Sequence, residues 1–217
     1  MPTEYTVGAS VSATREHDLE LARRAASGDR GAQRELFVEQ RANVHRALFR
    51  ILGSNREIED MLQDAFIEIF RALHSFRGDS TLGRWCQTIA IRVAYLAISR
   101  RRPPAVELAL VEETVASETD VRRHVQVREA TRRLYAALDR IEAKQRIAFA
   151  LAAIDGKSLA EVAELTHSSV FAVKTRVWRA RRELMRRASK DAALAAYLEE
   201  LKEVSHEIGR ASCRERV

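Results

Sequence analysis

The chain has 217 residues, and its 37 lysines and arginines against 31 aspartates and glutamates give a net charge of +6 at pH 7. This positive balance favours a polyanionic partner over an acidic small molecule. No run of about 18 apolar residues occurs in the sequence, so we expect no membrane insertion. The two cysteines form neither a disulfide framework nor a zinc-binding pattern, and we expect a cytoplasmic location.

The composition predicts an all-α protein, because Ala, Leu, Arg and Glu dominate and only three prolines and eight glycines occur. Residues 1–17 are polar and are expected to form a disordered N-terminus. A helical pattern begins at Asp18, and Gly28-Asp29 is typical of a helix end followed by an N-cap. The next helix is expected to end at Gly53.

A third helix is predicted after Ser54 and Glu57, which have capping-box spacing. Its apolar stripe comprises Ile58, Met61, Leu62, Phe66, Ile69 and Phe70. The polar loop 76–81 follows, with Phe76 on one side and Trp85 on the other. Two interpretations of Trp85 stay open: it packs in a helix stripe with Ile89 and Val93, or it stacks on unpaired bases beside positive charge.

The helix after this loop runs from about Leu82 to Arg101 and is ended by Pro103-Pro104. Residues 103–120 then hold five acidic residues and no basic residue, between two basic segments. This reversal of charge predicts a flexible acidic linker between two small helical domains, residues 18–102 and residues 121–190. A surface loop within one domain is the alternative interpretation.

The second half predicts a helix-turn-helix. Ser158 and Glu161 again have capping-box spacing, and residues 166–168 make a tight break before a long helix. His167 stands where such a turn usually needs a glycine with positive φ, a conformation that histidine tolerates better than most residues. The seam of the long helix is Val170, Val173, Val177, Ala180 and Leu184, which predicts one face packed on a core.

The opposite face of the long helix is strongly basic. Between Lys174 and Arg187 there are seven basic residues and one acidic residue, Glu183. A solvated helix usually mixes both signs of charge, so this face predicts an anionic partner, with small residues near bases and arginines near phosphates or guanines. A basic solvated face without a partner is the alternative interpretation.

The stretch DMLQDAFIEIFRALHSFRGDSTLGRW, followed by a helix with a basic end, a linker and LDRIEAKQRIAFALAAIDGKSLAEVAELTHSSVFAVKTRVWRARREL, resembles bacterial sigma factors of the extracytoplasmic-function (ECF) group. The resemblance covers about residues 18–190. It implies a transcription initiation factor that binds core RNA polymerase, reads the −10 and −35 promoter elements, and melts and captures the −10 strand. The first domain would bind the polymerase clamp and the −10 element, and the second would read the −35 element.

The resemblance also implies three sets of site residues. The polymerase-binding set is Asp60, Gln63, Asp64 and Phe66. The −10 set is Phe76, Arg77, Gly78, Asp79, Ser80, Trp85, Arg92, Arg100 and Arg101. The −35 set is Ser168, Phe171, Ala172, Lys174, Thr175, Arg176, Trp178 and Arg179. The helix of the first set is acidic and would repel DNA, which favours a protein partner there.

This sequence departs from the family pattern at several of these positions. Arg92 and Leu96 stand where relatives often have asparagine, and residues 167–172 replace the usual Gly-Val-Pro-Val-Gly-Thr. Phe171 is bulky where relatives keep glycine, so the promoter sequence does not follow from relatives. Whether an anti-sigma factor is a further partner is left open by the sequence.

Two other classes of protein explain the sequence less completely. A helix-turn-helix regulator acting on operator DNA would explain residues 121–187, but it would not explain the acidic helix or the loop 76–81. An enzyme is not expected, because no glycine-rich phosphate loop, metal-ligand spacing or nucleophile motif occurs. We therefore predict no catalytic residue, no cofactor and no metal.

Residues 191–217 form a C-terminal extension. An apolar stripe, Leu194, Tyr197, Leu198, Leu201, Val204 and Ile208, either packs back on the second domain or meets a regulator. The last nine residues, GRASCRERV, share no pattern with the rest, and a native and a vector-derived origin both stay open.

Overall fold

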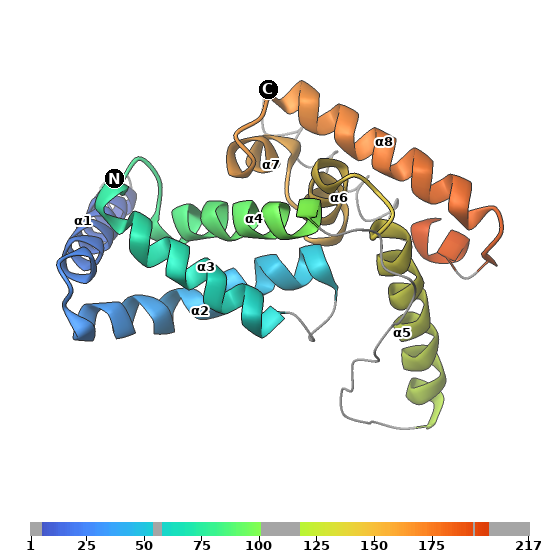
Figure 1. Ribbon diagram of the computed structural model, residues 1–217, viewed down its shortest axis with the longest axis horizontal. Helices are drawn as coiled ribbons and strands as arrows, with labels where there is room; N and C mark the ends of the chain where they lie inside the picture. Colours follow the sequence, from blue (N-terminus) through green and yellow to red (C-terminus); the bar gives the residue numbers. More distant parts are fainter. Residues whose placement is uncertain (1–5, 54–57, 101–117, 193, 200–217) are drawn as a thin grey trace, which may run out of the picture. The chain divides into compact units, whose positions relative to one another are not determined.

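The computed structural model describes residues 6–53, 58–100, 118–192 and 194–199. The regular elements of this part of the chain are all helices, with no strand among the described residues, which confirms the predicted fold class (Figure 1). The helices are α1 (Thr6–Ala26), α2 (Arg30–Leu52), α3 (Ile58–Ala72), α4 (Leu82–Arg100), α5 (Glu118–Leu138), α6 (Ala143–Phe149), α7 (Leu159–Leu165) and α8 (Val170–Ala188). A 3₁₀ turn covers Leu73–Ser75, and a π-helical turn covers Ala150–Ile154.

The chain divides into two compact units: residues 1–48 with 59–93, and residues 49–58 with 94–217. This division differs from the predicted boundary, because the ends of α2 and α4 belong to the second unit. Within that unit, the guanidinium of the buried Arg146 donates hydrogen bonds to the carbonyls of Ile51 and Leu52 and pairs with Asp139. The predicted linker lies largely outside the described residues, and its last residues begin α5.

Helix α1 begins earlier than the sequence predicted. It starts at Thr6, whereas residues 1–17 were expected to be disordered. Residues 6–17 contain no proline and a single glycine, so nothing in them opposes extension of the helix that continues to Ala26. Gly28 has φ +91°, and the Asp29 carboxylate accepts hydrogen bonds from the amides of Gly31 and Ala32, which confirms the predicted helix end and N-cap.

The core of the first unit lies between α1, α2, α3 and the start of α4. Its fully buried side chains include Leu36, Val44, Leu48, Ile69, Leu82 and Ala90. The predicted stripe of α3 is buried from Ile58 to Ile69, and Phe70 is half-buried. The capping box proposed at residues 54–57 lies outside the described residues. One face of α3 is thus fixed against the core, and the opposite face is left exposed.

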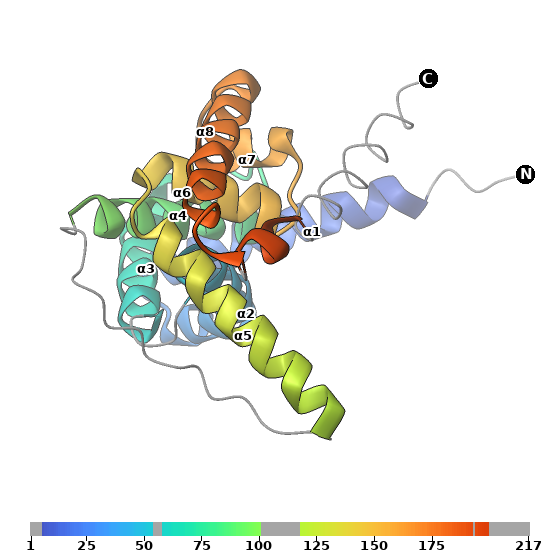
Figure 2. The ribbon, with the colours of Figure 1, turned by 90° about the vertical axis from the view of Figure 1, so that its right-hand side faces the viewer.

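The second unit is built around α8. Its core cluster joins residues of α5, α6 and α8 to two leucines beyond the end of α8, Leu194 and Leu198. Each of these leucines is 3% exposed, and the Thr131 hydroxyl donates to the hydroxyl of Tyr197 over 3.5 Å. The segment after α8, drawn in red in Figure 2, therefore packs on its own unit as far as residue 199, which was one of the two interpretations left open.

Replacing Leu198 by alanine is expected to lower the free energy of unfolding by about 2–3 kcal/mol, because it removes a buried side chain and leaves a cavity. Val127→Ala is the matched control, since Val127 is 46% exposed on α5. Urea denaturation of both variants measures the difference. Equal stability of the two variants would show that residues 190–199 do not stabilise the second unit.

Candidate functional site

Helix α7 is opened by a complete capping box. The Ser158 hydroxyl accepts a hydrogen bond from the Glu161 amide over 3.2 Å, and the Glu161 carboxylate accepts one from the Ser158 amide over 2.8 Å. Both end amides are thereby satisfied, as the sequence predicted. The short helix buries Val162, Ala163 and Leu165, which hold it against the second unit.

The turn between α7 and α8 is a Schellman motif with histidine in the left-handed position. The Ser168 amide donates to the Ala163 carbonyl over 2.8 Å, and the His167 amide donates to the Glu164 carbonyl over 3.2 Å. His167 has φ +46°, the single positive φ outside glycine in the described part of the chain. The predicted role of His167 is confirmed, and the two helices are joined without glycine.

Helix α8 begins at Val170, after Ser169 caps it by accepting a hydrogen bond from the Ala172 amide over 3.2 Å. Val173, Ala180 and Leu184 are fully buried, as the predicted seam requires, and Ala188 extends this seam. The seam prediction is wrong for Val170, which is 48% exposed. A residue in the first turn of α8 projects beyond the core that the later turns contact.

The outer face of α8 carries the predicted positive charge. Phe171, Lys174, Trp178, Arg179, Arg182 and Arg186 are exposed, and Ala172, Thr175 and Arg176 are half-buried. Glu183 accepts hydrogen bonds from Arg186 and also pairs with Arg187, and these contacts lower the pKa of its carboxyl to about 2. The one acidic residue of this segment thus faces the last arginines. Lys174 and Arg179 have no ion pair within the described residues.

Two polar contacts organise the start of this face. The Arg176 guanidinium donates to the Ser168 hydroxyl over 2.7 Å, and that hydroxyl donates to the Thr166 carbonyl. The contact between Arg176 and Ser168 therefore stabilises the turn. A ligand that binds either side chain would have to compete with this contact. Further along, the Arg182 guanidinium lies 5.5 Å from the centre of the Trp178 ring.

In the first unit, the two aromatic residues that flank the loop 76–81 contact each other. The rings of Phe76 and Trp85 lie 5.5 Å apart between centroids in an edge-to-face arrangement, and both are half-buried. Arg77, Asp79 and Ser80 are exposed, whereas Gly78 is buried. The structure therefore brings together the aromatic edge and the exposed polar loop that the sequence indicated.

This loop is held in place by residues far away in the sequence. The Leu82 amide, at the start of α4, donates to the carboxylate of the buried Asp18 on α1 over 2.8 Å. Gly78 has φ +70°, and a Cβ there would lie 3.1 Å from the Leu19 side chain. From α2, the side-chain amide of Asn43 donates a hydrogen bond to the Gly83 carbonyl over 3.0 Å. Asp18 and Asn43 escaped the sequence analysis, because both contacts join distant segments.

Along α4, Arg92 and Arg100 are exposed, and Leu96 is 39% exposed. Arg92 and Leu96 are four residues apart, so they share one face of the helix. Arg101 lies outside the described residues. Cys86 is fully buried on the same helix, and burial raises the pKa of its thiol to about 12, which leaves it unreactive.

The exposed face of α3 is acidic, with Asp60, Gln63 and Asp64 in the positions that the sequence indicated. Phe66 differs from this set, because it is 4% exposed and its ring packs 4.6 Å from that of Phe37. Phe66 therefore supports α3 from the inside, and a contact of Phe66 itself with a partner stays a prediction. Ile67, which is 47% exposed, was missed and lies on the same face as Asp60 and Asp64.

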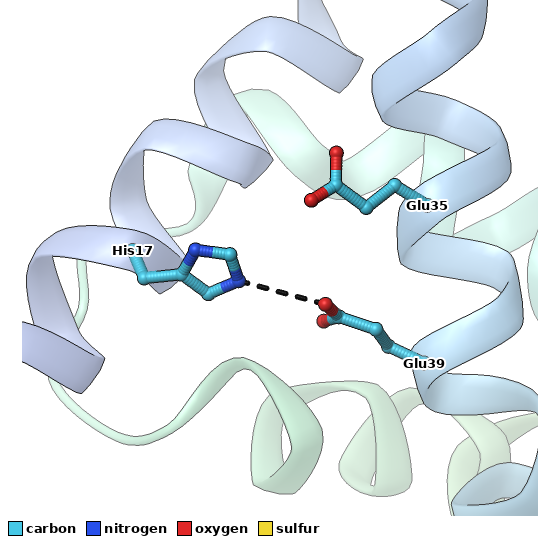
Figure 3. Close-up of side chains that lie close together, drawn as sticks. All are labelled: His17, Glu35 and Glu39. Carbon is cyan, nitrogen blue, oxygen red and sulfur yellow. Dashed lines mark ion pairs between the residues drawn. The ribbon is translucent and has the colours of Figure 1, made fainter.

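Donor atoms of His17, Glu35 and Glu39 lie within 4.8 Å of one another, between α1 and α2 (Figure 3). His17 points toward Glu39, and the two are 3.5 Å apart. Glu35 also lies 3.8 Å from Arg24. The side chains of His17, Glu35 and Glu39 are all exposed to solvent. Ion pairing accounts for this arrangement, and we assign no metal to it.

Two sigma-70 family descriptions match the chain: region 2 matches residues 36–103, and region 4 matches residues 131–184. The ECF RNA polymerase sigma-E factor of Escherichia coli (strain K12) is 31% identical over 173 residues, which cover 76% of this chain and 90% of that protein. The chain belongs to the ECF group of RNA polymerase sigma factors. The acidic helix and the loop 76–81 fall in region 2, and the helix-turn-helix falls in region 4.

Two further proteins resemble this sigma factor. The RNA polymerase sigma-H factor of Pseudomonas aeruginosa is 28% identical over 179 residues, which cover 77% of this chain and 92% of that one. The solved structure of CnrH in complex with the cytosolic domain of CnrY has a TM-score of 0.53 and 25% identity, with 80% of this chain and 98% of that chain covered. Like other sigma factors, this protein recognises promoters and takes part in transcription initiation, a role that is not catalytic.

In this sigma factor, Asp18→Ala is expected to lower the free energy of unfolding by about 1–3 kcal/mol, because the Leu82 amide loses its acceptor in a buried position. Asp18→Asn keeps an acceptor oxygen and should cost less. Asp79→Ala is the control, since Asp79 is exposed in the neighbouring loop. Chemical denaturation measures all three variants, and equal losses for Asp18→Ala and Asp79→Ala would contradict the anchoring role of Asp18.

Proposed function

We propose that this sigma factor binds core RNA polymerase, the −10 strand and the −35 duplex through three different surfaces. The exposed face of α3, with Asp60, Gln63 and Asp64, binds core RNA polymerase. The loop 76–81 and α4 capture the melted −10 strand, and α7 with α8 reads the −35 duplex. Residues 18–102 and 121–190 are then the two functional domains, and residues 103–120 join them.

The observation that carries this proposal is the opposite charge of α3 and α8. The exposed face of α3 bears Glu59, Asp60, Asp64 and Glu68, whereas the outer face of α8 bears a lysine and several arginines. DNA carries one negative charge for about every 1.7 Å of helix axis, so it is attracted to the outer face of α8 and repelled by α3. The exposed Ile67 adds an apolar contact for a protein partner on α3.

Capture of a single strand is supported by the chemistry of the loop 76–81. Half-buried aromatic rings offer a stacking surface that is absent from a wholly polar loop, and stacking contributes about 1–3 kcal/mol per base. Flipping a base out of the duplex costs a few kcal/mol. Contacts of this size in the loop would therefore offset much of the cost of opening the promoter. The anchors on α1 and α2 keep the loop in one position before DNA arrives.

We further propose that the protein acts in the cytoplasm, where it meets core polymerase and promoter DNA, and that it has no catalytic site, cofactor or metal of its own. A regulatory anti-sigma partner is proposed by analogy with CnrH, whose structure holds the cytosolic domain of CnrY.

Replacing Arg77, Asp79 and Ser80 together by alanine is expected to abolish promoter opening while polymerase binding stays intact. These side chains are exposed, so the fold tolerates the change, and Gly78 is kept because a Cβ there would crowd Leu19. Permanganate reactivity of thymines near the start site measures opening, and a core-polymerase pull-down measures binding. The control replaces the exposed Arg15 and Glu16 on α1 by alanine.

A bubble template separates opening from later steps. Because its strands are already unpaired, transcription by the loop variant should be partly restored on this template. A loop variant that still melts the duplex promoter would refute strand capture, and so would one that loses polymerase binding to the same degree as opening.

Lys174→Ala and Arg179→Ala are expected to weaken binding of the full chain to a selected −35 duplex and to reduce its salt dependence. Each lost phosphate contact should lower the salt slope by about one unit, and each lost base contact should cost about 1–3 kcal/mol with relaxed specificity. Arg186→Ala is the matched control, because Arg186 already pairs with Glu183. Wild-type affinity of both variants at every salt concentration would show that α8 does not bind this DNA.

A further inference from the structure

The first turn of α8 presents an unusual apolar tip. Phe171 is 80% exposed, the highest value among the large exposed apolar side chains described, and the neighbouring Val170 is 48% exposed. The ring of Phe171 makes no aromatic or cation–π contact within the described residues. An aromatic side chain in this position exposes apolar surface to water, and contact with a partner would bury it.

Position in the helix-turn-helix determines which partner this tip meets. Phe171 is the second residue of α8, two positions after the Ser169 cap. In helix-turn-helix proteins, the N-terminal residues of the recognition helix point at base edges in the major groove. Lys174 follows one turn later and Arg179 lies further along the exposed face, so the surroundings of Phe171 suit a polyanion better than an apolar protein surface.

Hydrogen bonding is largely unavailable at this tip. Residues 170–173 are Val, Phe, Ala and Val, so the first turn has no polar side chain. In the next turn, the Thr175 hydroxyl donates to the Phe171 carbonyl over 3.0 Å, and the Ser168 hydroxyl is engaged by Arg176 and Thr166. An apolar probe in the major groove can recognise one base feature, the C5-methyl group of thymine.

We propose that Phe171 is a specificity-determining residue that reads a thymine in the −35 element through contact with its C5-methyl group. This inference rests on the proposed role of α8 in reading the −35 duplex. Lys174 and Arg179 increase the affinity through contacts with the DNA backbone or with guanines. Phe171 distinguishes thymine from the other bases at one base pair. Trp178, seven residues later on the same side of α8, differs from Phe171 because the Arg182 guanidinium already lies over its ring.

The experiment uses holoenzyme formed from the full chain and core polymerase. Run-off transcription on a promoter library first selects a −35 element. Each thymine of that element is then replaced singly by deoxyuridine, which removes the methyl group and leaves base pairing unchanged. At one position, wild-type holoenzyme should bind about fourfold more weakly to the deoxyuridine duplex, the effect expected for one methyl group returned to water.

Phe171→Ala is expected to bind the thymine and deoxyuridine duplexes equally at that position. The ring is exposed, so the variant should keep the wild-type circular dichroism and melting temperature. Two matched variants, Trp178→Ala and Arg179→Ala, should bind both duplexes more weakly and keep the fourfold difference. Phe171→Leu, which retains an apolar side chain, should keep part of the fourfold difference between the two duplexes.

Several results would overturn the inference while the −35 assignment stands: a selected element without thymine, equal wild-type binding to all deoxyuridine duplexes, or a Phe171→Ala variant that still discriminates. Failure of the proposed function looks different. In that case the holoenzyme selects no upstream element at all, and Arg179→Ala changes neither transcription nor DNA binding.

Discussion

Burial of one apolar stripe on each amphipathic helix is the constraint on which the remaining structure depends. On α3 the buried residues run from Ile58 to Ile69, and on α8 they run from Val173 to Ala188. Each stripe fixes the rotation of its helix, so the opposite side must face outward. That outward side is acidic on α3 and basic on α8, and the core thereby decides which charges each unit presents. Core packing therefore decides where the acidic face of α3 and the basic face of α8 lie.

Where an interaction is local, the sequence predicted the structure well. The capping box of α7, the end of α1, the left-handed His167 and most of the α8 seam all involve residues within a few positions of each other. Side-chain chemistry alone specifies such features. The positions of Phe76 and Trp85 on either side of the loop 76–81 were also evident from the sequence, whereas the contact between their rings was seen only in the structure.

The remaining features depend on contacts that periodicity does not encode. Asp18 caps α4 from 64 residues away, and Phe66 is enclosed by Phe37 of a different helix. Val170 belongs to the apolar pattern of α8 but lies beyond the core that would cover it, so it stays exposed. Ile67 escaped attention for the opposite reason, since it falls outside the buried stripe of α3. Knowledge of which helices pack together was needed in each case.

The central claim is that the acidic face of α3 and the basic face of α8 act on different partners. Its most direct test reverses charge on α3 with Asp60→Lys and Asp64→Lys together, and measures core-polymerase pull-down and −35 duplex binding on the same full-length sample. Both side chains are exposed, so folding should be retained. We predict loss of polymerase binding with −35 binding unchanged or strengthened. Retained polymerase binding, or a parallel loss of both activities, would contradict the account.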